Sequence, residues 1–210
     1  MPSTLQVDKI IDGSATTNKE LAEYSSGNWS WGSGVPAGSI VQTKFVAFDG
    51  IQTIGNGSDD GTTFERIGKN ISGEEFSISM SVSSGNKIIG FGNVNLGASG
   101  RYSAIKCFVT PAGSSSVQIA SGTATSTSEV HVTVSSMSNQ SNTANEYLMM
   151  NSSFSFNYTP SNTSSHLYTV EAGNTNNPAV KTYINRTENE DNGTYIHRGY
   201  SSFILMEVAQ

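Results

Sequence analysis

The residues of this chain that could do chemistry are few and widely spaced. Its histidines, His131, His166 and His197, lie more than thirty residues apart, and none belongs to an HxxxH or HExxH pair that would bind zinc. We therefore expect each histidine to be a surface or sheet residue rather than a metal ligand or a general base. Serine is so common that no Ser-His-Asp triad can be singled out.

The single cysteine, Cys107, lies in the strand-like stretch RYSAIKCFVT. It can form no internal disulfide, and it has no CxxC partner with which to bind a metal. We expect it to be a small hydrophobic residue that faces the core.

Carboxylates gather in two turns, Asp59-Asp60 and Glu188 with Glu190-Asp191. Such clusters offer the oxygen ligands that Ca²⁺ prefers, but neither follows the D-x-[DN]-x-[DN]-G order of the calcium loop. We expect both to be solvated loops. Glycoside hydrolysis would need two carboxylates that flank a cleft, and no such pair stands out.

Glycine motifs also fail to indicate a reaction. The segment Gly90-Phe91-Gly92 begins like GxGxxG, but position 95 is Asn and the context is strand-like. No GxSxG nucleophile elbow occurs. The sequence therefore predicts a protein that is not an enzyme, with no catalytic residue, no cofactor and no metal.

The composition is polar but hardly charged. Ser, Thr, Asn and Gly make up 94 of 210 residues, whereas only 13% are charged and 35% hydrophobic. Disorder would fit the polar bias, but the aromatic residues sit inside alternating runs, which favours a thin sandwich with long polar turns, steadied by neighbouring subunits. The net charge is −6 and the basic residues are scattered singly, so we expect no nucleic-acid partner. No signal peptide is evident and no apolar stretch is long enough to span a membrane, so we expect no membrane insertion.

From residue 39 onward the pattern is that of short strands. The clearest period-2 segment is 75–82, in which Phe76, Ile78, Met80 and Val82 share one face. Glycines in KIIGFGNVNLG indicate bulges or close backbone approach. Other strands are expected at 39–48, 62–67, 102–110, 117–120 and 129–134.

The C-terminal part continues the pattern. Phe154, Phe156 and Tyr158 alternate with polar residues, and the last hydrophobic run stops so near the terminus that we expect a paired terminal strand. In all, about ten to twelve short strands at near-regular spacing predict an all-β fold, an antiparallel sandwich like a jelly roll.

Residues 1–36 differ from the rest and predict a short extended N-terminal segment. Short strands or hooks are expected at 5–7 and 9–11, one helical turn at 19–24, and a loop in GNWSWGSGVPAG. The paired Trp side chains of that loop would gain most by burial, either against another chain or against this chain's own sheet. Candidate docking residues are Leu5, Val7, Ile10, Ile11, Trp29 and Trp31.

Several segments resemble tail-fibre and virion appendage proteins of tailed bacteriophages, especially those of marine phages. They are NWSWGSGVPAGSIVQT, SFSFNYTPSNTSSHLYTVEA, a G-S-[IV]-[IV]-Q strand at Gly38–Gln42, a [VT]-Y-I-N-R strand at Thr182–Arg186, and a terminal L-M-E-[IV]-A strand at Leu205–Ala209. The resemblance spans about residues 30–210 and brings no catalytic residue with it.

The resemblance implies a non-enzymatic protein on the exterior of a phage particle. Residues 1–36 would anchor it to other virion proteins, and residues 37–210 would form the displayed domain. Family members are homo-oligomers, most often trimers, and often attach to the host surface, where hydroxyl and amide groups suit glycans. A capsid-attached fibre or decoration protein, and a glycan-cleaving tailspike, are the alternatives.

Overall fold

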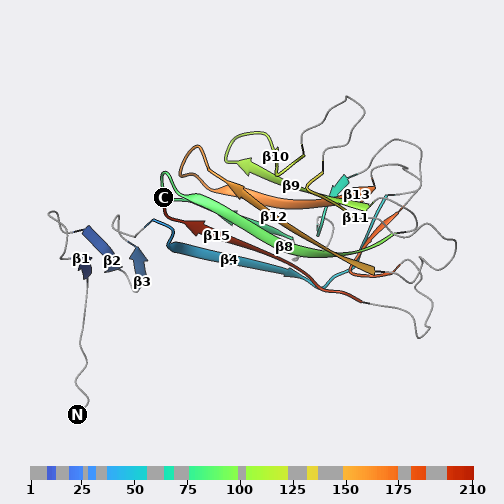
Figure 1. Cartoon of the computed structure of the whole chain (residues 1–210), viewed down its shortest axis with the longest axis horizontal. Coiled ribbons are helices and arrows are strands. Elements are labelled where there is room, and N and C mark those ends of the chain that lie inside the picture. Colours follow the sequence, from blue (N-terminus) through green and yellow to red (C-terminus); the bar gives the residue numbers. More distant parts are fainter. Residues whose placement is uncertain are drawn as a thin grey trace, which may run out of the picture.

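The computed structural model describes residues 9–12, 19–25, 28–31, 37–55, 64–68, 76–98, 103–122, 132–136, 149–174, 181–187 and 198–210. These residues form strands and turns, and no helix occurs among them (Figure 1). The strands are β1 (Lys9–Asp12), β2 (Lys19–Ser25), β3 (Asn28–Trp31), β4 (Ile40–Phe48), β5 (Gln52–Ile54), β6 (Phe64–Arg66), β7 (Ser77–Met80), β8 (Lys87–Ala98), β9 (Ser103–Pro111), β10 (Val117–Ile119), β11 (Val134–Ser136), β12 (Met149–Tyr158), β13 (His166–Asn174), β14 (Thr182–Ile184) and β15 (Ser201–Val208).

Two antiparallel sheets pack face to face, as the sequence predicted. One layer has the order β4-β15-β8-β12. In the same layer, β14 pairs with β8 beyond the end of β15, and β5 pairs with β14. The other layer has the order β7-β13-β9-β10. In that layer, β6 pairs with β13 on the same edge as β7, and β11 pairs with β9 on the same edge as β10. Along the eight strands of these two orders (β4, β7, β8, β9, β10, β12, β13 and β15), the chain passes from one layer to the other at each step except between β9 and β10, so the strand order is that of a jelly roll.

The inner faces of both sheets build one hydrophobic core. Phe154 and Phe156 of β12 point inward, and their rings pack on Phe203 and Tyr168. Cys107 is buried among them, as predicted, and burial raises the pKa of its thiol to about 12. The thiol is therefore protonated at neutral pH and acts as a small hydrophobic group.

Glycines on β8 make room for these rings. Gly90 pairs with Phe156 and Gly92 with Phe154, and a Cβ atom at either glycine would overlap the ring of its partner. The pairings of β8 with β12 and with β15 along these glycines run without an extra residue. Of the two expectations for this segment, close approach is confirmed and a bulge in β8 is wrong.

A buried carboxylate fastens one end of β15. Glu207 is fully buried, and its carboxylate accepts hydrogen bonds from Gln42 Nε2, from Asn86 Nδ2 at 2.7 Å and from the Ser83 N–H at 2.7 Å. Burial by itself would raise the pKa of Glu207, but these hydrogen bonds outweigh it and the pKa is lowered. The carboxylate thus joins β15 to β4 and to the turn before β8.

A buried amide fastens the other end of β15. Asn185 has a positive φ of 58°, and its Nδ2 donates to Phe48 O at 2.6 Å and Gly50 O at 3.0 Å. Its Oδ1 accepts from Ser201 Oγ at 2.6 Å, and its backbone N–H donates to Asn95 O at 2.9 Å. One side chain therefore connects the ends of β4, β14 and β15.

The N-terminal strands form a sheet of their own, β1-β2-β3, and no described strand pairing joins it to the sandwich (Figure 1). The expected helical turn at 19–24 is wrong, since residues 19–25 are β2. A helix this short is marginal in water, whereas β2 pairs on both edges. The expected loop is also wrong at 28–31, because tryptophan favours strands and both Trp residues lie in β3.

One other expected strand is misplaced. The strand expected at 129–134 begins only at Val134, and residues 129–131 lie outside the described part of the chain. Thr133 precedes it, and its hydroxyl accepts the Cys107 N–H at 3.0 Å. A side-chain oxygen therefore replaces the backbone carbonyl that a paired strand would offer. The strands expected at 39–48, 62–67, 75–82, 102–110 and 117–120 are confirmed with ends shifted by one or two residues.

We predict that Gly90→Ala destabilises the protein by about 1–3 kcal/mol, because the added methyl group overlaps the Phe156 ring in a filled core. The midpoint of urea unfolding measures this loss. Gly122→Ala is the matched control, since no atom lies within 4 Å of the Cβ position there, and it should change stability by less than about 0.5 kcal/mol. Equal effects of the two substitutions would contradict the prediction.

We predict that Glu207 stabilises the fold in a pH-dependent manner. Because its folded-state pKa is below the ordinary value of 4.5, its contribution is complete above about pH 4.5 and is lost as the pH falls through the lowered pKa. Glu207→Gln should cost about 1–3 kcal/mol near neutral pH, since an amide N–H₂ then faces hydrogen-bond donors. The difference in melting temperature between wild type and Glu207→Gln should shrink in acid, and a constant difference from neutral pH to about pH 3 would refute the assignment.

Candidate interaction surface

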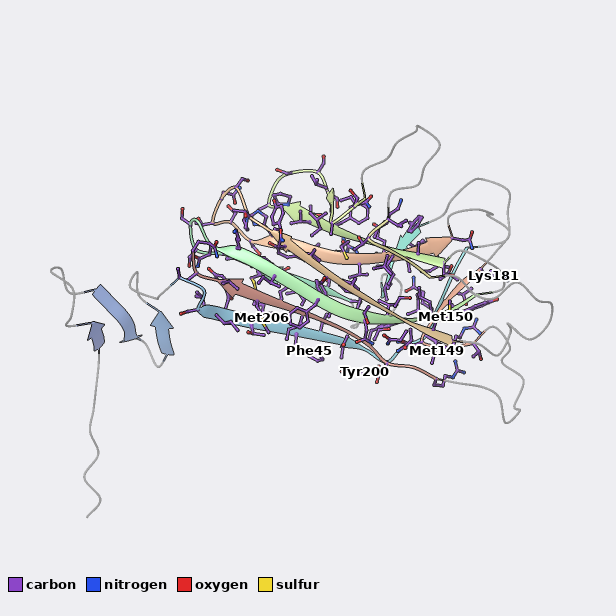
Figure 2. The ribbon with its side chains drawn as sticks, viewed as in Figure 1. Phe45, Met149, Met150, Lys181, Tyr200 and Met206 are labelled. Carbon is purple, nitrogen blue, oxygen red and sulfur yellow. The ribbon has the colours of Figure 1, made fainter. Side chains whose placement is uncertain are left out.

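The outer face of the β4-β15-β8-β12 sheet has a polar end and an apolar end. The pairing registers align its outward side chains in rows across the strands, for example Phe45, Ile204 and Phe91 in one row. The next row holds Met206 and Ile89, and the row after it Val208 and Ile40. Figure 2 shows Met206, Phe45 and Tyr200 in succession along β4 and β15, on the side away from the opposing sheet.

These rows form what we call the apolar patch. Its most exposed members are Phe45 (59%), Ile40 (50%), Ile89 (39%) and Phe91 (38%). The full set is Ile40, Phe45, Ile89, Phe91, Ile204, Met206 and Val208. An exposed apolar group of this extent on one face of a protein indicates contact with another surface.

A hollow of about 400 Å³ borders the apolar patch on the side of the polar end. Phe45, Phe91 and Ile204 form its apolar wall. Its remaining lining is Gly92, Asn93, Ser153, Phe154 and Ser202. The hollow has the size of a small-ligand site, but it also suits one large side chain.

The polar end carries a chain of hydrogen-bonded side chains, which we call the amide row: Asn93, Asn95, Asn151 and Ser153. Ser153 Oγ donates to Asn151 Oδ1 at 3.2 Å, and Asn151 Nδ2 donates to Asn95 Oδ1 at 3.1 Å. Asn95 Nδ2 and Asn93 Nδ2 both donate to the backbone carbonyl of Tyr200. Three strands therefore hold the amides in fixed positions beside the Tyr200 side chain, which is 49% exposed.

This face holds almost no charge. Among the outward residues of its described strand pairings, Lys87 at the end of β8 is the one charged side chain. The surface therefore offers aromatic and aliphatic groups at one end and neutral hydrogen-bonding groups at the other.

The residues that the sequence suggested for chemistry are not brought together here. His166 is a sheet residue, as predicted, and is fully buried in β13, with Nδ1 2.7 Å from Ser164 O. Its Nε2 and the Tyr168 hydroxyl have no hydrogen-bond partner within the described part of the chain. Burial, with Tyr158 and Glu207 nearby, raises the pKa of Tyr168. His131, His197 and both acidic turns lie outside the described residues.

The candidate docking residues are only partly described. Ile10 and Ile11 lie in β1, and Trp29 and Trp31 lie in β3. Leu5 and Val7 lie outside the described residues.

Neither a metal-binding group nor a membrane-spanning helix occurs among the described residues. They contain no group of three or more His, Cys, Asp or Glu side chains that could hold a metal ion. Nor is there, in those ranges, a helix of the length and hydrophobicity needed to cross a membrane. No protein-family model and no curated protein matches this chain.

Sequence reasoning missed both the apolar patch and the amide row. A signal for the apolar patch was present, because Phe203–Met206 is a continuous apolar run, which is typical of strands covered on both faces. The amide row had no such signal. Its members come from β8 and β12, more than fifty residues apart, and asparagine is common throughout the chain.

Proposed function

We propose that this chain is a non-enzymatic structural protein on the exterior of a phage virion, a tail fibre or appendage that displays the jelly roll and attaches it to the host surface. The observation that carries attachment is the amide row with the exposed Tyr200 ring beside it. Aromatic rings pack against the apolar faces of sugars, and fixed amides exchange hydrogen bonds with their hydroxyl groups. We therefore propose a glycan as the host ligand.

The segments that resemble phage proteins support this proposal by their positions. The Gly38 N–H donates to Ala209 O at 2.8 Å, and Gln42 donates to Glu207, so the motifs at Gly38–Gln42 and Leu205–Ala209 bind each other. Asn185 of the third motif holds the start of β15 through Ser201. The three motifs are thus the parts that close one sandwich, which is where a family of displayed domains would resemble one another.

The separate β1-β2-β3 sheet supports a division of roles. It precedes β4, the first strand of the sandwich, and contains Ile10, Ile11, Trp29 and Trp31. We propose that residues 1–36 bind other virion proteins. The amide row lies at the opposite end of the outer face from Ile40, where the chain enters the sandwich, so an anchored protein would present it outward.

We predict that the protein binds neutral glycans through the amide row. On an array of bacterial oligosaccharides, neutral glycans should bind better than acidic ones, because the chain carries a net charge of −6. Asn151→Ala should weaken binding about threefold to tenfold through lost hydrogen bonds, and Tyr200→Ala should weaken it by about tenfold or more through lost ring contact.

Asn157→Ala is the matched control, since Asn157 is exposed on the same face of β12 but beyond the amide row. It should leave binding unchanged. Equal binding by all variants would remove the amide row from the proposal. Release of new reducing ends from a bound polysaccharide would replace the adhesin by the tailspike alternative.

We predict that a variant lacking residues 1–36 keeps the unfolding midpoint of the sandwich but no longer joins virus particles, because its first strand begins at Ile40. Incorporation is measured by particle purification and immunoblotting. Truncated protein in purified particles would contradict the anchor. A density map of whole particles then distinguishes attachment to the tail from attachment to the capsid.

A further inference from the structure

We infer that the apolar patch is covered by other copies of this chain. The inference deepens the proposed function, on whose oligomeric assembly it rests, and assigns that assembly to one surface.

The order of apolar residues along β15 indicates that both of its faces are covered. Along β15, Phe203 and Leu205 face the core, and the alternating residues Ile204 and Met206 face outward. A strand with one solvated face alternates apolar with polar residues, whereas a strand buried on both faces is apolar throughout. The central run of β15, residues 203–206, has the second pattern, so the outer face of this part of the strand is built to be covered, like its inner one.

The exposed area of the apolar patch fits the centre of a protein interface. The exposed fractions of the four most exposed side chains, Phe45, Ile40, Ile89 and Phe91, together amount to nearly two whole side chains, or about 350 Å². A stable interface buries about 800 Å² on each partner, with an apolar centre and a polar rim. The apolar patch supplies the centre, and Thr43 and Ser155 beside it supply part of a rim.

The distribution of charge over the chain favours a second copy as the occupant of the apolar patch. Each chain carries a net charge of −6, so two copies repel each other unless they meet where acidic groups are absent. The outward residues of the described pairings of β4, β15 and β8 include no Asp or Glu, and the one charged residue among them, Lys87, lies at the margin. Two such faces can meet without burying an unpaired charge.

The hollow beside the apolar patch also suits a second copy of the chain. Phe45 is the most exposed large hydrophobic residue described in the chain, and the hollow of about 400 Å³ next to it is walled by Phe91 and Ile204. Side chains of a neighbouring copy can enter it as the two sheets pack face to face. The amide row lies at the other side of the hollow and stays at the border of the interface.

The test is the mass of the full-length protein in solution by light scattering over a range of concentrations. The wild type should have a multiple of 22.2 kDa. Phe45→Glu and Ile89→Glu should weaken association at least tenfold and shift the mass toward 22.2 kDa, and Phe45→Ser should do so more mildly. Val117→Glu is the matched control, because Val117 is 55% exposed on the other sheet, and it should leave the mass unchanged. Circular dichroism confirms that each variant is folded.

Three results would overturn the inference: a monomeric wild type, an oligomer indifferent to the patch substitutions, or an oligomer broken equally by Val117→Glu. Tryptophan emission separates one rival occupant, since Trp29 and Trp31 are the only two tryptophans. A monomer whose emission shifts on Phe45→Glu would place the N-terminal segment on the patch. A wild type that associates through the apolar patch but binds no glycan would count against the amide row and not against this interface.

Discussion

The sandwich depends on the insertion of its last strand, β15, between its first strand, β4, and β8. This pairing joins residues that are more than 150 positions apart in the chain, so its loop-closure entropy must be offset by strong local contacts. Polar side chains supply them at both ends. The Glu207 carboxylate connects β15 to Gln42 and to the turn before β8, and Asn185 connects the start of β15 to the end of β4. Because both groups are buried, losing one partner would leave an unsatisfied polar group, which makes the pairing specific as well as stable.

The same three strands, together with β12, carry the candidate interaction surface. β15 and β8 place Leu205 and Val94 in the core and Ile204 and Phe91 outside, so each strand contributes to two surfaces by alternation alone. The fold and the candidate surface are therefore not independent. A register shift of one residue in β15 would expose core residues and bury the patch, and the bonds of Glu207 and Asn185 prevent such a shift.

The sequence predicted the sandwich well where one face is buried and the other solvated. The alternation in 75–82 and in Phe154–Tyr158 named inward residues correctly, because burial on one side of a strand imposes period 2. Prediction failed for residues 19–25 and 28–31, whose strands are defined by their pairing with each other. The roles of Asn185 and Glu207 were also invisible, although both lay in recognised motifs. Their partners Phe48 and Gln42 are far away in sequence, and only the completed topology brings them together.

On the proposed function, the arrangement of the outer face would link assembly to attachment. The apolar rows lie toward Ile40 and reach Phe91 on β8, and the amide row follows at Asn93 and Asn95, roughly 7–13 Å beyond Phe91. If neighbouring copies bury the apolar rows with their strands in the same direction, their amide rows come to lie side by side at one end. Single sugar contacts made by a few amides and one ring are weak. Several such sites on a rigid assembly bind a repetitive polysaccharide with an avidity that exceeds the affinity of each site by about 10²–10⁴. On this proposal the polar, uncharged end of the sheet needs no deep pocket, because the avidity would come from the assembly proposed for the apolar end.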